Sequence, residues 1–110
     1  MDTCAYDVCS VAEMTAGGAQ LTIFSTGRGT PSGNPIAPVL KLTGNDHTAS
    51  WMADFIDFDT SPSLRQEQTI EQLGEALLQM IVRVASGELV KHEVLGVGVE
   101  IAMPRLCNYC

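Results

Sequence analysis

The residues best placed to do chemistry lie in one loop, residues 25–34 (STGRGTPSGN). Its glycines let the backbone approach a ligand closely and offer N–H groups to it. Arg28 lies between Gly27 and Gly29, so its guanidinium can present a planar fork to a carboxylate or phosphate. Hydroxyl donors are added by Thr26, Thr30 and Ser32. This pattern predicts the binding of a small anion.

The loop connects two segments with the composition of strands. Residues 19–25 are uncharged and largely apolar or β-branched, which predicts a buried strand, and residues 39–43 predict a second. Ligands of open α/β sheets bind at the carboxyl ends of strands, so we expect the anion site where the first strand ends. The alternative is an exposed connection whose glycines only permit tight turns. The loop is neither a P-loop nor a dinucleotide fingerprint, because both glycine motifs are absent.

Shorter elements are expected on both sides of this unit. Asp7 is expected to cap a short helix, which Gly17 ends in a left-handed conformation. A helix over residues 46–54 is expected to direct apolar side chains toward the core: Trp51, Met52 and Phe55. Residues 55–58 predict a third strand, and residues 97–103 a fourth.

The longest helix is expected from Thr69 to Ala85. Thr69 and Gln72 form a capping box, and Ser86 with Gly87 ends the helix. The apolar residues repeat with helical spacing: Ile70, Leu73, Leu77, Met80, Ile81 and Val84. One face of this helix is therefore expected to pack on the sheet.

The order of these elements predicts the fold class. Helices alternate with strands, and crossover helices imply a mainly parallel sheet that is covered on both faces. We therefore predict a single α/β domain over residues 1–110, a small three-layer fold of flavodoxin- or Rossmann-like character.

The composition is that of a folded domain and excludes several function classes. The chain has 110 residues, of which 45% are apolar and 17% charged, which argues against disorder. The net charge of −7 and the scattered Lys and Arg residues argue against nucleic-acid binding. No apolar run has the length of a membrane span and no targeting segment is recognised, so we expect a cytoplasmic protein with no membrane partner.

The cysteines lie in pairs near the two ends of the sequence: Cys4 with Cys9, and Cys107 with Cys110. The CxxC spacing of the second pair suits zinc binding or redox exchange. The first pair is more widely spaced, and Cys110 is the last residue, where chains fray. Free thiols are therefore favoured over a four-cysteine metal site, and disulfides are not expected in a reducing compartment.

The other titratable residues form no complete catalytic set. Lys41 lies inside a strand, where we expect it either to reach a substrate carboxylate or, as the simpler structural role, to pair with Asp57. Asp57 and Asp59 have the spacing for one strand face, which suits a hard cation or acid–base work, although turn carboxylates are commoner. His47 and His92 are isolated and are expected at the surface. The catalytic residues stay unknown at this level.

A set of short motifs extends over residues 1–87. The most specific are Thr-Gly-Arg-Gly at residues 26–29 and the segment Ala37-Pro38-Val39-Leu40-Lys41-Leu42, followed by Asn45. Further matching positions are Met1-Asp2-Thr3, Ser10-Val11, Ala16 to Gln20, Met52, Ile56 and Asp57. Together they resemble the carboxyl-terminal part of the altronate/galactarate dehydratase family, which in a broad sense includes sulfolactate sulfo-lyase. The chain departs from that pattern at Cys4-Ala5, where the family often has Pro-Gly.

The resemblance implies a lyase that removes water from a sugar acid such as altronate or galactarate to give a 2-keto-3-deoxy acid. It also implies a divalent metal, iron, with ligands outside this chain. Family enzymes are much larger, so the 110 residues are expected to be a C-terminal domain that is inactive alone. The implied partners are a small sugar-acid substrate and the remaining domains of the same enzyme. The implied substrate-binding residues are Thr26, Gly27, Arg28, Gly29, Thr30 and Lys41.

Two alternative functions stay open. The chain is equally suited to the C-terminal part of a sulfolactate sulfo-lyase, a branch with which Gly33-Asn34-Pro35-Ile36 is compatible. A non-catalytic α/β module that binds a small anion or another subunit is the competing class. The identity of the acid and the formation of a homo-oligomer are not decided by the sequence.

Overall fold

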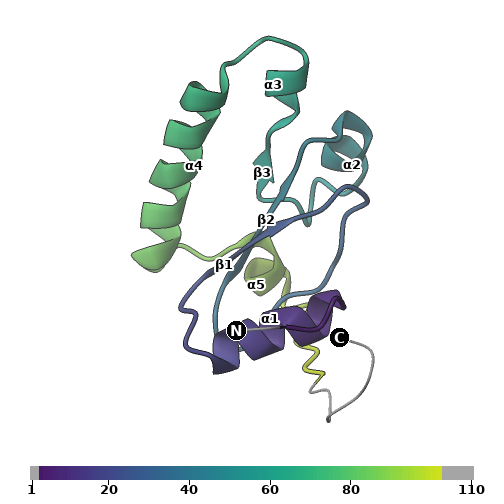
Figure 1. Cartoon of the computed structure of the whole chain (residues 1–110), viewed down its shortest axis with the longest axis vertical. Helices are drawn as coiled ribbons and strands as arrows, with labels where there is room; N and C mark the ends of the chain where they lie inside the picture. The colour runs from purple at the N-terminus through teal and green to yellow at the C-terminus, as the bar shows by residue number, and fades with distance from the viewer. Residues whose placement is uncertain (1–2, 103–110) are drawn as a thin grey trace.

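The computed structural model describes residues 3–102. The elements are α1 (Asp7–Ala16), β1 (Thr22–Ser25), β2 (Val39–Thr43), α2 (Asp46–Trp51), β3 (Phe58–Asp59), α3 (Ser61–Leu64), α4 (Ile70–Ala85) and α5 (Lys91–Leu95). Figure 1 shows α4 along one side of the sheet, with α2 and α3 toward one end of the molecule and α1 toward the other. No described helix has the length and apolarity needed to cross a membrane.

The strands form one parallel sheet in the order β1-β2-β3. Thr22 is in register with Val39, and Leu42 is in register with Phe58. The predicted α/β class and the predicted parallel pairing across the glycine-rich loop are therefore confirmed. The connection from β1 to β2 contains no helix, because it is rich in proline and glycine, neither of which favours a helix interior.

The two faces of β2 carry different chemistry. Alternate residues of a strand point to opposite sides of the sheet. Leu40 and Leu42 belong to the face that α4 covers. Val39, Lys41 and Thr43 belong to the other face, and all three are buried. The central strand therefore separates an apolar core from a layer with polar contacts.

The apolar core lies between β2 and α4. Leu40 packs with Val84 of α4 and with Val90, which follows that helix. Partly buried apolar side chains surround this cluster: Leu21, Phe58, Leu77, Met80 and Ile81. Because burial of each large aliphatic side chain is worth about 1.5–3 kcal/mol, this contact holds α4 on the sheet.

Several predicted features of the shorter elements are wrong. Trp51 was expected in the core but is 72% exposed. It is the last residue of α2, and its indole stacks on the His47 ring outside the core, with ring centroids 6.5 Å apart. The third strand is Phe58–Asp59 instead of residues 55–58, since the chain turns after α2 before it pairs with β2. Residues 97–102, the described part of the predicted fourth strand, contain no strand. The left-handed glycine after α1 is Gly18, with φ of 102°, and not Gly17, whose φ is −76°. Asp7 does not cap α1, because it is the first helical residue and Tyr6 holds the N-cap position.

The capping box of α4 is confirmed. The Thr69 hydroxyl accepts a hydrogen bond from the Gln72 N–H (3.2 Å), and the Gln72 side chain accepts one from the Thr69 N–H (2.9 Å). Each end of this box satisfies a backbone donor that the first turn of a helix leaves unpaired. The box therefore fixes where the longest helix begins.

Replacement of Thr69 by alanine should lower the free energy of unfolding by about 1 kcal/mol, because it removes the acceptor for the Gln72 N–H. Urea denaturation followed by circular dichroism measures this change. Thr69→Ser keeps the hydroxyl and should recover most of the stability. Equal stability of the alanine variant and the parent would show that the box does not stabilise α4.

Candidate functional site

The glycine-rich segment, residues 26–34, is called the Arg28 loop below. It leaves β1 at the carboxyl end of the parallel sheet, and it lies beside the start of α2, which follows β2. Loop residue Gly27 accepts hydrogen bonds through its carbonyl from the Thr48 hydroxyl (2.8 Å) and from the Asn45 side-chain amide (3.2 Å). The Asn45 side-chain oxygen also caps α2, accepting from the N–H of His47 and of Thr48. The first half of the loop is thus anchored to the β2–α2 junction.

The loop hydroxyls are used within the loop. The Thr26 hydroxyl accepts from the Gly29 N–H (3.0 Å). The Thr30 hydroxyl donates to Ser32 Oγ (3.0 Å) and accepts from the Ser32 N–H (3.2 Å). These side chains therefore shape the turn, in addition to any role toward a ligand.

The second half of the loop is anchored to Lys41. This side chain is 0% exposed, and its Nζ donates to the carbonyls of Ser32 (2.9 Å) and Thr30 (3.2 Å). Burial lowers the pKa of the Lys41 ammonium, and the Asp57 carboxylate opposes part of that shift. A direct ligand contact by Lys41 would require the loop to move away from its ammonium.

The predicted Lys41–Asp57 ion pair is replaced by backbone contacts. The Asp57 carboxylate accepts from the N–H of Lys41 (2.7 Å) and from the N–H of Lys91 (2.8 Å). The Lys91 ammonium in turn donates to the carbonyls of Ala53 and Ile56 (2.6 Å each). Asp57 therefore joins β2 to the start of α5 and does not pair with the Lys41 ammonium. Asp59 accepts from the Ser61 N–H instead (2.8 Å), so the two carboxylates serve separate structural contacts.

His92 lies beneath the loop, and its predicted place at the surface is wrong. It is 2% exposed, and its Nε2 accepts a hydrogen bond from the Val39 N–H (3.3 Å). Burial lowers the pKa of His92, and the charge of Lys41 lowers it further. Three weaker effects raise this pKa: the charges of Glu93 and Asp57 and a hydrogen bond to the Val97 backbone. A five-residue helix carries no periodicity that could have revealed this burial.

The loop glycines serve different purposes. Gly29 has φ of 86°, and a Cβ there would come within 2.0 Å of the Met52 sulfur. A Cβ on Gly33 would come within 2.3 Å of the His92 ring. Gly27 has open space around it, with nothing within 4 Å of a Cβ. Gly29 and Gly33 are therefore required by packing, whereas Gly27 leaves the surface beside Arg28 open.

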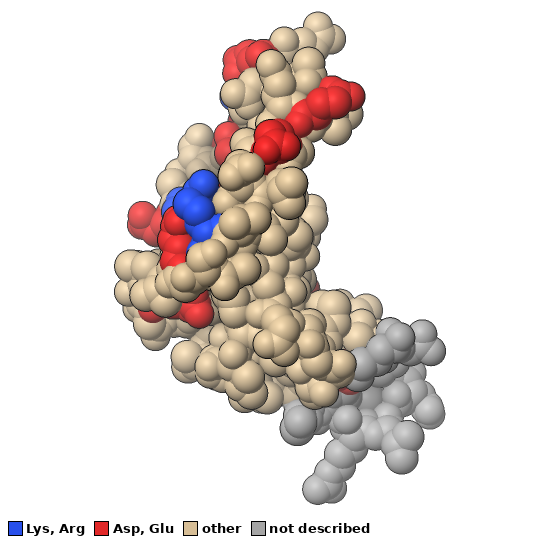
Figure 2. Space-filling view, turned by 90° about the vertical axis from the view of Figure 1, so that its left-hand side faces the viewer, with Lys and Arg blue, Asp and Glu red and all other residues tan. Residues whose placement is uncertain are grey.

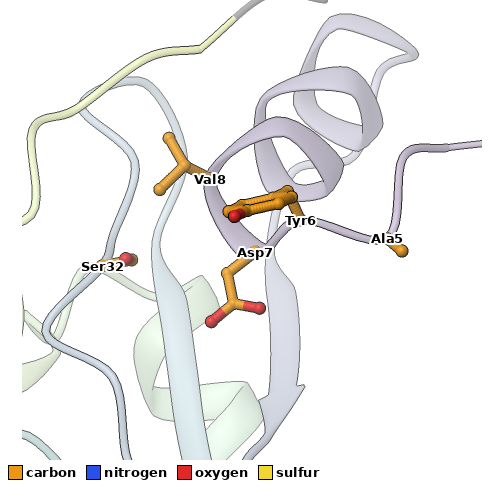
Figure 3. A pocket seen from close by; sticks show the side chains of 5 residues that line it. All are labelled: Ala5, Tyr6, Asp7, Val8 and Ser32. Carbon is orange, nitrogen blue, oxygen red and sulfur yellow. The ribbon is translucent and has the colours of Figure 1, made fainter. Parts of the chain in front are cut away.

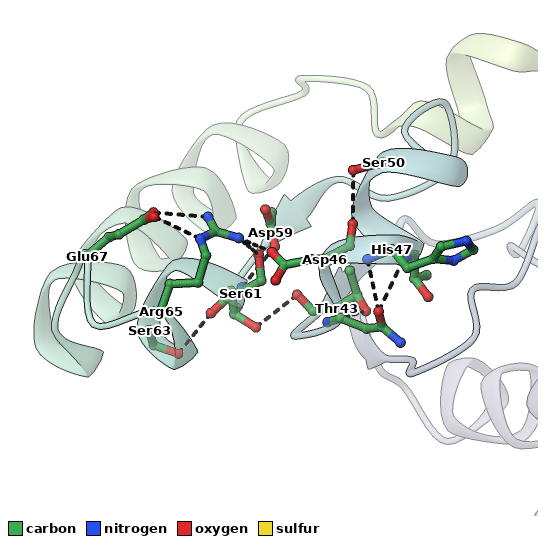
Figure 4. Close-up of polar contacts among 12 residues, drawn as sticks. Thr43, Asp46, His47, Ser50, Asp59, Ser61, Ser63, Arg65 and Glu67 are labelled. Carbon is green, nitrogen blue, oxygen red and sulfur yellow. Dashed lines mark hydrogen bonds and ion pairs between the residues drawn. The ribbon is translucent and has the colours of Figure 1, made fainter.

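Arg28 is exposed, as predicted, and differs from the other described basic residues. Among the Lys and Arg residues of positions 3–102, Arg28 is the one whose side chain has no hydrogen-bond or ion-pair partner. The other basic groups are all engaged: Arg65 with Asp46 and Glu67, Arg83 with Glu88, Lys91 with Ala53 and Ile56, and Lys41 with Thr30 and Ser32. Figure 4 shows Arg65 between its two carboxylates, and basic atoms on the face in Figure 2 lie close to acidic ones. Arg28 is thus the cation available to an anionic ligand.

A hollow of about 340 Å³ separates the start of α1 from the Arg28 loop (Figure 3). Its lining residues are Ala5, Tyr6, Asp7, Val8 and Ser32. This lining contains a carboxylate and no basic group, which disfavours an anion. The prediction that Arg28 itself lines a pocket stays a prediction.

The described residues do not fit a metal ion. Within residues 3–102, no group of three or more His, Cys, Asp or Glu residues is placed to hold one. Cys4 is buried and Cys9 is half-buried in the α1 region, while Cys107 and Cys110 lie outside the described residues. No chemical step is therefore assigned to a metal held by this part of the chain.

Comparison with known proteins supports the sequence resemblance. Residues 1–107 match the family described as D-galactarate/altronate dehydratase, C-terminal. The chain is 38% identical over 96 residues to the beta subunit of (2R)-sulfolactate sulfo-lyase from Chromohalobacter salexigens, an alignment that covers 87% of this chain and 25% of the relative. It is 35% identical over 86 residues to galactarate dehydratase (L-threo-forming) from Escherichia coli, covering 78% of this chain and 16% of that enzyme. It is 31% identical over 87 residues to altronate dehydratase from Bacillus subtilis, an alignment that covers 79% of this chain and 17% of that enzyme. The chain thus spans a quarter or less of the length of these relatives.

The contact between His92 and Val39 should make stability depend on pH. Because the folded state lowers the pKa of His92 below its ordinary value of 6.5, protonation favours unfolding. The stabilisation by neutral His92 is fully present above pH 6.5. The free energy of unfolding should therefore decrease as the pH falls from 6.5 through the folded-state pKa. Urea denaturation at pH 7.5, 6.5 and 5.5 measures it, and His92→Gln, which does not titrate, should flatten this part of the profile. An NMR titration that places the His92 pKa above 6.5 would contradict the assignment.

Proposed function

Because the chain belongs to the D-galactarate/altronate dehydratase C-terminal family, we propose that it is the C-terminal domain of a longer sugar-acid hydro-lyase. In this proposal the Arg28 loop binds a carboxylate of the substrate, and Thr26, Gly27, Gly29, Thr30 and Lys41 form or support that subsite. The observation that carries the proposal is an exposed guanidinium without a partner on a loop that is anchored on both sides.

The loop geometry suits a carboxylate. The N–H groups of Gly27 and Arg28 have no partner among the described residues, so they are available together with the guanidinium. A charge-assisted, two-pronged contact from arginine is stronger and more directional than a neutral hydrogen bond. The anchored backbone lowers the conformational entropy lost on binding, since the loop is already ordered. The acidic domain can thus hold an anion through one local site despite its net charge of −7.

In the proposed reaction, a proton is removed from the carbon next to the carboxylate and the β-hydroxyl leaves as water. The resulting enol becomes a 2-keto-3-deoxy acid by moving a proton from oxygen to carbon. Negative charge grows on the carboxylate side of the substrate when the first proton leaves, and the Arg28 guanidinium is suited to stabilise that charge. We assign the base, and the ligands of the iron that the family resemblance implies, to parts of the enzyme outside this chain.

A sulfo-lyase is the second candidate. The observation in its favour is the 38% identity to the beta subunit of (2R)-sulfolactate sulfo-lyase over 87% of this chain. Sulfolactate also carries a carboxylate, so the Arg28 loop suits it equally well. Activity measured on galactarate, altronate and (2R)-sulfolactate with the full-length enzyme separates the two candidates, and activity on none of them favours a non-catalytic anion-binding module.

In the full-length enzyme, Arg28→Ala should lower kcat/KM by roughly 30- to 1,000-fold, because the substrate carboxylate loses a charge-assisted contact worth about 2–4 kcal/mol. Arg28→Lys should recover part of the loss, since an ammonium cannot make the two-pronged contact. Arg83→Ala is the matched control, because Arg83 pairs with Glu88 on the surface of α4. Unchanged catalytic efficiency in a folded Arg28→Ala enzyme would remove the loop from the site.

Residues 1–110 alone should produce no 2-keto acid from galactarate, altronate or sulfolactate, with or without ferrous iron. The reason is that no complete set of catalytic residues is recognised in the chain. A colorimetric assay of 2-keto acids on the purified chain measures this. Turnover above the buffer background would place a catalytic base within these residues.

A further inference from the structure

The buried lysine at the centre of the sheet is unusual in its position. Lys41 lies in the middle of β2, the central strand, and no part of it is exposed. An ammonium buried without hydrogen bonds would strongly destabilise the fold. Its presence there therefore requires contacts that satisfy its donors.

Two of the three donors of this ammonium are used by the Arg28 loop. A lysine ammonium has three N–H donors. Two hydrogen bonds go to the carbonyls of Thr30 and Ser32, on either side of Pro31. The remaining side of the ammonium faces the Phe55 ring, whose centroid is 5.7 Å from Nζ. Because the Lys41 side chain is 0% exposed and two of its donors hold the loop, the ammonium is not accessible to a substrate in this arrangement.

We infer that Lys41 is a positioning residue, whose ammonium holds the second half of the Arg28 loop so that Arg28 faces the ligand in a fixed geometry. The first half of the loop is held independently of Lys41, because the Gly27 carbonyl accepts hydrogen bonds from the side chains of Asn45 and Thr48. Arg28 and Gly29 lie between these two anchors. The inference rests on the proposed function of Arg28 and adds that Lys41 acts through the loop, without contact to the substrate.

Lys41→Met tests this role. Methionine keeps most of the side-chain length and apolar volume, but it leaves the Thr30 and Ser32 carbonyls without their donor. An arginine-specific protease then reports on the loop, because cleavage after Arg28 requires the loop to leave its anchors. We expect cleavage after Arg28 to accelerate at least about tenfold relative to cleavage after Arg83, since hydrogen bonds to a charged donor are lost.

Leu40→Met is the matched control for a change in the same strand. Leu40 is equally buried but belongs to the α4 face, so the ratio of cleavage after Arg28 to cleavage after Arg83 should stay as in the parent. A folded Lys41→Met protein with an unchanged ratio would overturn the inference. If Lys41→Met does not fold, the 15N–1H signal of the ammonium in the unmodified protein decides. A slowly exchanging signal supports the anchor, and rapid exchange with solvent overturns it.

Kinetics of the full-length enzyme separate positioning from simple stabilisation. Lys41→Met should raise KM, and the decrease in kcat/KM should be smaller than the decrease caused by Arg28→Ala. The double variant should have the same kcat/KM as Arg28→Ala alone. Additive losses would show that Lys41 does not act through Arg28. If Arg28→Ala has no effect on kcat/KM, the proposed function fails, while the proteolysis result still decides whether Lys41 holds the loop.

Discussion

The contact on which the site depends is the one between the buried Lys41 ammonium and the backbone of the Arg28 loop. It joins a side chain from the centre of the sheet to carbonyls of Thr30 and Ser32, which no strand or helix would otherwise pair. A buried carbonyl without a donor is costly, and so is a buried ammonium without acceptors. Each group therefore satisfies the other, and the loop has a defined shape although it contains no regular structure.

A second polar layer keeps this contact in place. Asp57 accepts from the backbone of Lys41 and of Lys91, so the start of α5 is held at β2. His92 then lies under the loop, where Gly33 leaves room for its ring. The layer is built from hydrogen bonds rather than ion pairs, which suits a region where burial penalises charge. The opposite face of β2 needs no such bonds, because α4 covers it with apolar side chains.

The arrangement is compatible with the proposed anion site in an acidic domain. The described basic groups other than Arg28 are neutralised or engaged in holding the backbone. Arg28 projects from an anchored loop between glycines, so its charge is directed outward without a carboxylate beside it. Under the proposed function, this charge binds a carboxylate of the substrate, because sugar acids carry carboxylates.

Some of this could be read from the sequence alone, because local signals were sufficient. The capping box at Thr69 and the apolar repeat determined α4, and the β-branched run at residues 39–43 determined β2. The position of the Arg28 loop after a strand, and its exposure, followed from the same local patterns. These features depend on residues that are close in sequence, where spacing and capping are direct evidence of structure.

Other features were decided only by the tertiary structure. The Val39 N–H meets His92 across 53 positions of sequence, and the Lys91 N–H meets Asp57 across 34. No periodic pattern encodes such pairs, so His92 was expected at the surface and Lys41 in an ion pair. Trp51 was expected in the core, although the short α2 leaves it outside. The sequence determined which residues carry charge and where α1, α4, β1 and β2 form. Packing determined which charges are buried, because burial depends on what the rest of the chain places on top of each residue.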